Sequence, residues 1–248
     1  MNTVAPSHTL QMANTVSKTG PAPQRILIVR LGSMGDVIHA LHAVTAIRKA
    51  APETTIGWLI EKRWVELLAS PSASRSGERS PQRPLVDEIH TVNTFAWRHA
   101  PFSAGTWGEI TAARKELRAP NYEAVLDLQG AIRSAVMARW AKVPVIGAEE
   151  PREKIARILY ARRIEAQGAH VIEQNLSLAR AVFPFRMDDC GTALPSDSAA
   201  EEKMASWLRN QGTSNFALLN PGAGWAAKQW PAERYAQVAK QLAKEGLL

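Results

Sequence analysis

The sequence predicts a doubly wound α/β fold built on a parallel sheet, and three observations support this class. Short β-branched runs alternate with segments whose apolar residues recur at helical spacing, an order typical of βαβ units. The run from Arg25 to Val29 leads through Gly32 and Gly35 into a helical pattern, which is how such a domain opens. Hydrophobic residues make up 46% of the 248 residues, enough for a substantial core.

The first half of the chain follows this alternation with one interruption. The strand Arg25–Leu31 is rich in Ile and Val, and the helical pattern of 37–50 ends before Pro52. A strand, a short helix, an exposed loop rich in Ser, Pro and Arg, and a third strand are then predicted at 55–60, 64–69, 70–84 and 88–92. Residues 94–108 hold aromatic side chains with Gly and Pro in no clean period, so they predict a functional loop or flap before a basic helix at 110–118.

The second half continues in the same order. A strand, a helix, a short strand, a very basic segment of helical spacing and another helix are predicted at 122–128, 130–141, 145–147, 152–163 and 171–183. A linker at 184–195 then leads to a helix, a strand, a glycine loop and a final helix at 199–211, 216–220, 221–227 and 231–246.

These elements predict three parts. Residues 1–24 are polar, lack the apolar core of a secretory signal and are expected to be a disordered extension. Residues 25–190 form an N-terminal Rossmann-like domain. Residues 191–248 form a linker and the start of a second Rossmann-like domain, because one strand and two helices are too few to bury a sheet.

The composition limits the classes of function. A net charge of +7 favours anionic partners such as phosphorylated substrates, nucleic acid or an acidic membrane surface, or else reflects a generally basic surface. Cys190 is the single cysteine, which excludes an intramolecular disulfide and fits a reducing compartment. No zinc-type Cys/His cluster is present, and no apolar run reaches the ~20 residues that span a bilayer.

Several binding classes lack their sequence patterns. The chain has no helix-turn-helix, zinc-finger or RNA-recognition pattern, so nucleic acid is not an expected partner. It has no P-loop, which argues against an ATPase. The pair Gly32 and Gly35 departs from G-x-G-x-x-G spacing, which disfavours a nucleotide-dependent oxidoreductase.

Asp36 is the most informative polar residue, since it places a carboxylate where a helix begins beside a ligand crevice. There it can act as a general base, and partial burial would make it a better one. Alternatively Ser33 and Asp36 form an S-x-x-D pair that caps the helix. The residues alone leave both interpretations open.

The second glycine loop and the basic residues give further candidates. Backbone N–H groups at Gly222 and Gly224 can approach an anion, and Lys228 adds a positive charge there or else is a solvated lysine before a helix. Arg98 and Arg133 have guanidinium groups suited to carboxylates or phosphates, or they are surface residues.

Asp127 and Gln129 end a strand near the crevice, where they either orient a ligand or form a turn. The basic residues of 152–163 either touch an acidic membrane surface or coat an exposed helix.

Three ordered blocks resemble the bacterial lipopolysaccharide heptosyltransferases. Residues 25–41, with the core Gly-Ser-Met-Gly-Asp-Val-Ile-His at 32–39, resemble their N-terminal block. Residues 121–134 resemble their second block, and 220–231 resemble their interdomain block. The stretch 97–104 also resembles the corresponding loop of the type I members.

This resemblance implies a two-domain GT-B glycosyltransferase that transfers heptose from ADP-heptose to Kdo of the lipid A core with inversion, without metal or cofactor. Asp36 would be the catalytic base. The acceptor would be bound by Ser33, Met34, Gly35, Arg98, Gln129 and Arg133, and the donor by Gly222, Gly224 and Lys228. The enzyme would be cytoplasmic and peripheral to the inner membrane.

The sequence departs from the family pattern in two places, and the second of them favours another hypothesis. Residues 222–227 contain no hydroxyl side chain, and the family's later Asp-Thr-Gly…His nucleotide block is absent from these 248 residues. The alternative is therefore a truncated, non-catalytic remnant that binds the acceptor.

Overall fold

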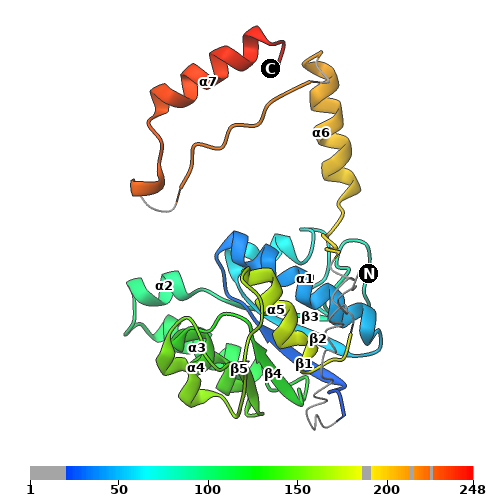
Figure 1. Cartoon of the computed structure of the whole chain (residues 1–248), viewed down its shortest axis with the longest axis vertical. Helices are drawn as coiled ribbons and strands as arrows, with labels where there is room; N and C mark the ends of the chain where they lie inside the picture. Colours follow the sequence, from blue (N-terminus) through cyan, green and yellow to red (C-terminus); the bar gives the residue numbers. More distant parts are fainter. Residues whose placement is uncertain (1–20, 186–190, 213–214, 224–225, 248) are drawn as a thin grey trace, which may run out of the picture. The chain divides into compact units, whose positions relative to one another are not determined.

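The computed structural model describes residues 21–185, 191–212, 215–223 and 226–247. The chain forms two compact units, one ending at Ser196 and the other beginning at Asp197 (Figure 1). The sequence predicts the corresponding division after residue 190.

The first unit is built on a six-stranded parallel sheet with the order β3-β2-β1-β4-β5-β6. Its strands are β1 Arg25–Val29, β2 Thr55–Glu61, β3 Glu88–Val92, β4 Ala124–Asp127, β5 Val145–Ala148 and β6 Arg162–Ile164. The chain runs from β1 outward to β3 and then returns to place β4 on the other side of β1. This reversal creates a switch point between β1 and β4, the place where open α/β sheets bind ligands. The predicted α/β class with a parallel sheet is confirmed.

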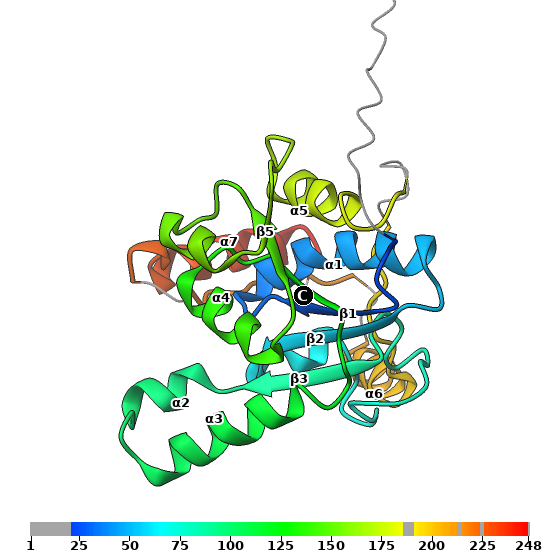
Figure 2. The ribbon, with the colours of Figure 1, turned by 90° about the horizontal axis from the view of Figure 1, so that it is seen from below.

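Helices and short 3₁₀ turns connect the strands. The α-helices of this unit are α1 Met34–Ala50, α2 Thr94–His99, α3 Ala104–Glu116, α4 Ile132–Ala138 and α5 Val171–Arg180. The 3₁₀ helices are η1 Lys62–Leu67, η2 Arg139–Ala141 and η3 Lys154–Leu159. α1 and α5 pack together, and they lie side by side in both views (Figures 1 and 2).

Hydrophobic cores cover both faces of the sheet. Ile26 and Ile28 of β1 pack in a cluster with residues of α1 and α5, whereas Leu27 and Val29 pack in a second cluster with residues of α3 and α4. Because β1 is buried on both faces, its sequence is continuously apolar rather than alternating. This explains why the strand was recognisable from its composition.

The predicted loop or flap at 94–108 is wrong, because α2 and the first turn of α3 occupy it. The Asn93 side chain accepts a hydrogen bond from the backbone N–H of Ala96, and the Ser103 side chain accepts one from Thr106. These caps begin two helices whose short length gives no clean apolar period.

The predicted basic helix at 152–163 is also wrong in its second half. Residues 154–159 form η3, but Arg162 and Arg163 belong to the edge strand β6, which pairs with β5. Their side chains are partly or fully exposed on that edge, so the sequence shows no apolar run.

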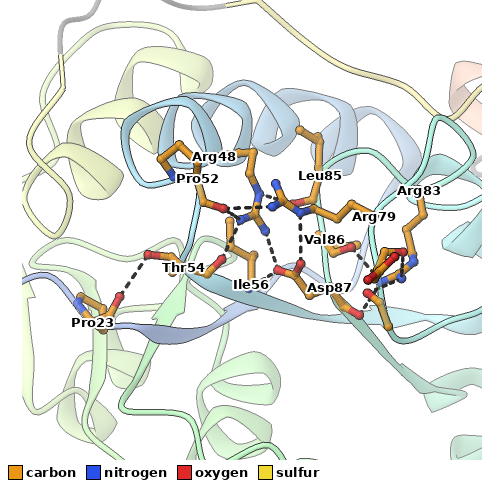
Figure 3. Close-up of polar contacts among 12 residues, drawn as sticks. Pro23, Arg48, Pro52, Thr54, Ile56, Arg79, Arg83, Leu85, Val86 and Asp87 are labelled. Carbon is orange, nitrogen blue, oxygen red and sulfur yellow. Dashed lines mark hydrogen bonds and ion pairs between the residues drawn. The ribbon is translucent and has the colours of Figure 1, made fainter.

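Two buried arginines, Arg48 and Arg83, fix the loop at 70–84 and the residues that follow it before β3 (Figure 3). Arg48 donates to the carbonyls of Leu85 and Thr54 at 3.0 and 2.6 Å and pairs with Asp87 at 2.5 Å. Arg83 is 2% exposed and donates to the carbonyls of residues 77, 78, 86 and 87. The predicted loop is therefore tied to the core through backbone carbonyl groups.

The second unit contains α6 Ser198–Asn210, η4 Ala226–Lys228 and α7 Ala232–Lys244. The predicted strand at 216–220 is wrong: the structure assigns it no strand, and Leu218 is 88% exposed. A strand needs hydrogen-bonding partners, and the described residues of this unit provide none. Neither α6 nor α7 has a buried residue.

Candidate functional site

The predicted catalytic and acceptor residues of the first unit lie at the carboxyl ends of neighbouring strands. Ser33 ends the loop after β1, Met34, Gly35 and Asp36 form the first turn of α1, and the loop after β4 carries Gln129. β1 and β4 are adjacent, so these loops flank the switch point of the sheet.

Asp36 is held by two residues and remains within reach of solvent. Its Oδ1 lies 2.9 Å from Arg30 Nη2, and its side chain is 32% exposed. Its Oδ2 accepts hydrogen bonds from the Ser33 backbone N–H at 3.0 Å and the Ser33 hydroxyl at 3.3 Å. The carboxylate therefore caps α1, as one interpretation of the sequence held, while it stays accessible to a ligand.

Burial raises the pKa of Asp36, but the Arg30 charge and the hydrogen bonds from Ser33 and Arg30 outweigh it and lower the pKa from its ordinary value. Asp36 is consequently ionised at neutral pH. Partial burial does not make it a stronger base in this structure.

Arg30 was missed by the sequence analysis and links the two loops. Its side chain is 7% exposed, and Nη1 donates to the Leu128 carbonyl while Nη2 contacts Asp36. Burial lowers the Arg30 pKa, although Asp36 and Asp127 oppose that shift. The cation at the end of an apolar strand was the available sequence signal.

Gln129 and Asp127 shape the loops. The Gln129 side chain is buried and accepts a hydrogen bond from the Leu31 backbone N–H at 2.8 Å. Asp127 is 1% exposed and accepts hydrogen bonds from Ser134 Oγ and Tyr160 Oη, each at 2.9 Å, and from two backbone N–H groups of the following turn. Burial raises the pKa of Asp127 despite these donors. Of the two interpretations of Asp127, the structure supports the one in which it forms a turn.

Gly130 is required by the backbone at the end of this turn. Its φ is +66°, and a Cβ there would lie 3.0 Å from the Arg152 backbone nitrogen. This close approach brings the segment before η3 against the start of α4.

Two predicted acceptor arginines converge on Thr94, which the sequence analysis did not single out. Arg98 Nε lies 3.4 Å from the Thr94 carbonyl, and Arg133 Nη1 lies 3.4 Å from the Thr94 hydroxyl. Both arginines are exposed. Helices α2 and α4 thus present two guanidinium groups suited to an anionic ligand.

Thr94 is fixed by a second missed residue, Glu61. The Glu61 side chain is buried at the carboxyl end of β2, where it accepts hydrogen bonds from the Thr94 N–H at 3.2 Å and from the Thr94 hydroxyl. The sequence signal for Glu61 is an acidic residue at the end of an apolar strand.

The predicted donor residues belong to the second unit. Gly224 lies outside the described residues. The Gly222 N–H donates to Asn220 Oδ1 at 3.0 Å, and Lys228 is exposed at the end of η4. Lys228 is therefore accessible to a phosphate, whereas the Gly222 N–H must exchange its partner to bind one.

The described residues contain neither a cluster of metal-ligating side chains nor a membrane-spanning helix. In those ranges no three His, Cys, Asp or Glu side chains gather as metal ligands. No helix in the same part of the chain is long and apolar enough to cross a membrane.

The family model described as glycosyltransferase family 9 (heptosyltransferase) matches residues 110–248. Lipopolysaccharide heptosyltransferase 1 of Escherichia coli K12 is 29% identical over 227 residues, which are 90% of this chain and 66% of that protein. The protein of the same name from Pseudomonas aeruginosa is 26% identical over 226 residues, 90% of this chain and 59% of its own length. The chain thus spans about two thirds or less of the length of these relatives.

Solved structures give the same picture. The E. coli heptosyltransferase WaaC with ADP-2-deoxy-2-fluoro heptose aligns with a TM-score of 0.68 and 27% identity, covering 90% of this chain and 67% of that one. A family 9 glycosyltransferase from Veillonella parvula aligns with a TM-score of 0.71, 92% coverage of this chain and 63% of its own. Its identity of 17% supports the fold alone.

Proposed function

The chain belongs to glycosyltransferase family 9, and from that premise we propose that it transfers heptose from ADP-heptose to a Kdo sugar of the lipopolysaccharide inner core. One observation carries the proposal: a solvent-accessible carboxylate, Asp36, lies at the switch point of a sheet whose fold matches an enzyme solved with an ADP-heptose analogue. Transfer inverts the anomeric centre and uses no metal or cofactor in this proposal.

Asp36 acts as the general base. The Kdo hydroxyl oxygen bonds to the anomeric carbon of the heptose, its proton passes to Asp36, and the bond to the diphosphate breaks so that ADP leaves with the electron pair. Arg30 and Ser33 orient the carboxylate through the contacts described above. Because they also lower its pKa, Asp36 takes the proton as attack makes the hydroxyl more acidic.

The ligands are recognised through charge. Arg98 and Arg133 bind the carboxylate or phosphate groups of a Kdo-lipid A acceptor, beside Ser33, Met34 and Gly35. Gln129 supports this site by holding the loop after β1. Lys228, with backbone N–H groups at Gly222 and Gly224, binds the donor diphosphate. An acceptor of this kind implies a cytoplasmic location at the surface of the inner membrane.

A second candidate function is acceptor binding without transfer. It is favoured by the second unit, whose described residues form no strand and whose helices α6 and α7 bury no side chain. A sheet-based nucleotide site is therefore missing from that part of the structure.

The test is heptosyl transfer by the purified chain with ADP-heptose and Kdo-lipid A, followed by mass spectrometry, with Asp36→Ala in parallel. We expect product from the wild type and at least a hundredfold less from the variant. Equal rates would remove Asp36 from the mechanism. Acceptor binding without product from either chain would support the second candidate.

A further inference from the structure

The segment from α4 to η3 exposes four aliphatic side chains. Ile132, Val136, Ile155 and Ile158 are 43%, 45%, 59% and 78% exposed. We call these four residues, together with the exposed Arg139, Arg152 and Lys154 of the same segment, the α4–η3 surface. Single exposed aliphatic residues are ordinary, but a group on two touching elements marks an interaction site.

The helices place these side chains outward. Ile132 and Val136 are four residues apart on α4, and Ile155 and Ile158 are three apart on a 3₁₀ helix, so each pair shares a side of its element. The inward-facing residues of the same two elements include Ala135, Ala138 and Ala156, which are fully buried in the core.

Hydrogen bonds join the two elements. Glu153 donates its backbone N–H to the Gly130 carbonyl at 2.9 Å, and its carboxylate accepts from the Ile132 N–H at 2.8 Å. α4 and η3 are also in direct contact. The four aliphatic side chains therefore stand on one rigid support.

The same segment is strongly basic. Residues 131–163 contain eight Lys and Arg and only three Glu. Two of these acids are engaged locally: Glu149 pairs with Arg157 at 2.7 Å and Arg163 at 3.5 Å, and Glu153 caps α4. Arg139, Arg152 and Lys154 are exposed, which leaves positive charge on the segment that carries the aliphatic residues.

We propose that the α4–η3 surface docks on an anionic lipid bilayer. The aliphatic side chains enter the boundary between headgroups and acyl chains, and the cations contact lipid phosphates. α4 also carries Arg133, so docking brings the bilayer to the carboxyl edge of the sheet. The inference rests on the proposed function in one respect, that the acceptor is a lipid held in a membrane.

Vesicle sedimentation of the full chain tests the aliphatic part. We use vesicles of phosphatidylethanolamine with phosphatidylglycerol, and vesicles of phosphatidylcholine alone. Ile155→Ser with Ile158→Ser is expected to lower partition into the anionic vesicles about tenfold. The matched control, Met204→Ser with Leu218→Ser, removes side chains of similar exposure from the second unit and is expected to change it less than about twofold.

A second pair of variants tests the charge. Arg139→Gln with Lys154→Gln is expected to weaken partition roughly tenfold. Lys240→Gln with Lys244→Gln, on α7, reaches the same net charge and is expected to have little effect. Equal losses from both pairs would show non-specific attraction and overturn the proposal.

Two other results would also overturn it. One is equal binding to anionic and phosphatidylcholine vesicles, or to neither. The other is a chain that self-associates in ultracentrifugation and becomes monomeric in the Ile155→Ser, Ile158→Ser variant while vesicle binding is unchanged, since the surface would then join copies of the chain. None of these assays needs sugar transfer, so an inactive chain that binds anionic vesicles refutes the proposed function and not the surface.

Discussion

Asp36 combines a structural and a proposed chemical role because its two carboxylate oxygens have different partners. One faces the buried Arg30, and the other caps α1 through Ser33. The carboxylate is therefore fixed in orientation while a third of its side-chain surface stays open. Because these contacts are present without substrate, their effect on the Asp36 pKa can be measured in the free protein.

The first prediction concerns Arg30. Arg30→Met removes the main charge that lowers the Asp36 pKa and leaves the burial that raises it, so the pKa should rise. Carboxyl ¹³C NMR titration measures it directly. Arg30→Lys keeps the positive charge and should hold the pKa near the wild-type value, and an unchanged pKa in Arg30→Met would contradict the role of Arg30.

The second prediction concerns pH and stability. The folded chain lowers the Asp36 pKa below the ~3.9 of an unfolded aspartate, so the ionised form favours folding. That contribution is complete above about pH 4 and is lost as pH falls through the lowered pKa. The melting temperature of Asp36→Asn should therefore approach that of the wild type on acidification below about pH 4. Calorimetry across this range checks the trend, and a gap that grows in acid would refute it.

At the scale of elements, the Tyr122 side chain passes close to β2 and links it to β3 and α3. Tyr122 lies across Gly57, where an added Cβ would be 1.8 Å from the Tyr122 hydroxyl. That hydroxyl is 2.7 Å from His90 Nε2, and His90 Nδ1 is 2.9 Å from Glu116 on α3. Gly57 thus allows a polar chain that runs from the buried Tyr122 and His90 to the exposed Glu116 and ties α3 to the sheet.

The third prediction follows from this crossing. Gly57→Ala should destabilise the chain by roughly 2–3 kcal/mol, because either Tyr122 or the strand must move. Gly108→Ala, in the exposed interior of α3 with nothing within 4 Å of the added Cβ, should instead stabilise it by roughly 0.5–1 kcal/mol. Chemical denaturation measures the change in the free energy of unfolding for each variant. A Gly57→Ala variant as stable as the wild type would refute the steric argument.

The elements also show what the sequence can predict. Continuous apolar runs predict strands that are buried on both faces, such as β1 and β2. The helical period of its apolar residues predicts the helix after β1. The edge strand β6 and the capped helix α2 depend on pairing and local hydrogen bonds, which composition does not display. The segment 216–220 has the composition of a strand, but composition supplies no partner.

The candidate site divides in the same way. Asp36 was predictable because one local motif, a glycine loop before a helix, places it. Arg30, Glu61 and Thr94 were not, because their roles depend on contacts between strands that are far apart in sequence. Gln129 was predicted near the site, but only the structure shows its side chain turned to the Leu31 N–H.

At the scale of the whole molecule, the two units differ in how much they bury. Both hydrophobic cores consist of residues from the first unit, whereas α6 and α7 contribute no buried residue. The two cores of the first unit are therefore built from its own side chains. Its candidate base and acceptor residues also lie entirely before Ser196.

The fourth prediction uses this division. A chain of residues 21–196 should melt within about 3 °C of the full chain, because it keeps both cores. It should also bind Kdo-lipid A in detergent with unchanged affinity, since Arg98 and Arg133 are retained. Circular dichroism and surface plasmon resonance measure the two properties. Asp36→Ala in the short chain should leave acceptor binding within about threefold, because a general base acts mainly in the transition state.

Binding of the donor nucleotide, unlike binding of the acceptor, should weaken when the second unit is removed. Lys228 and the glycine loop are absent from residues 21–196, so calorimetric titration with ADP should detect weaker binding than to the full chain. Lys228→Ala in the full chain should weaken ADP binding about tenfold, the loss expected for a hydrogen bond to a charged group, while Lys240→Ala on α7 should not. Equal ADP affinity in the short and full chains would place the nucleotide on the first unit and would remove Lys228 from the proposed donor site.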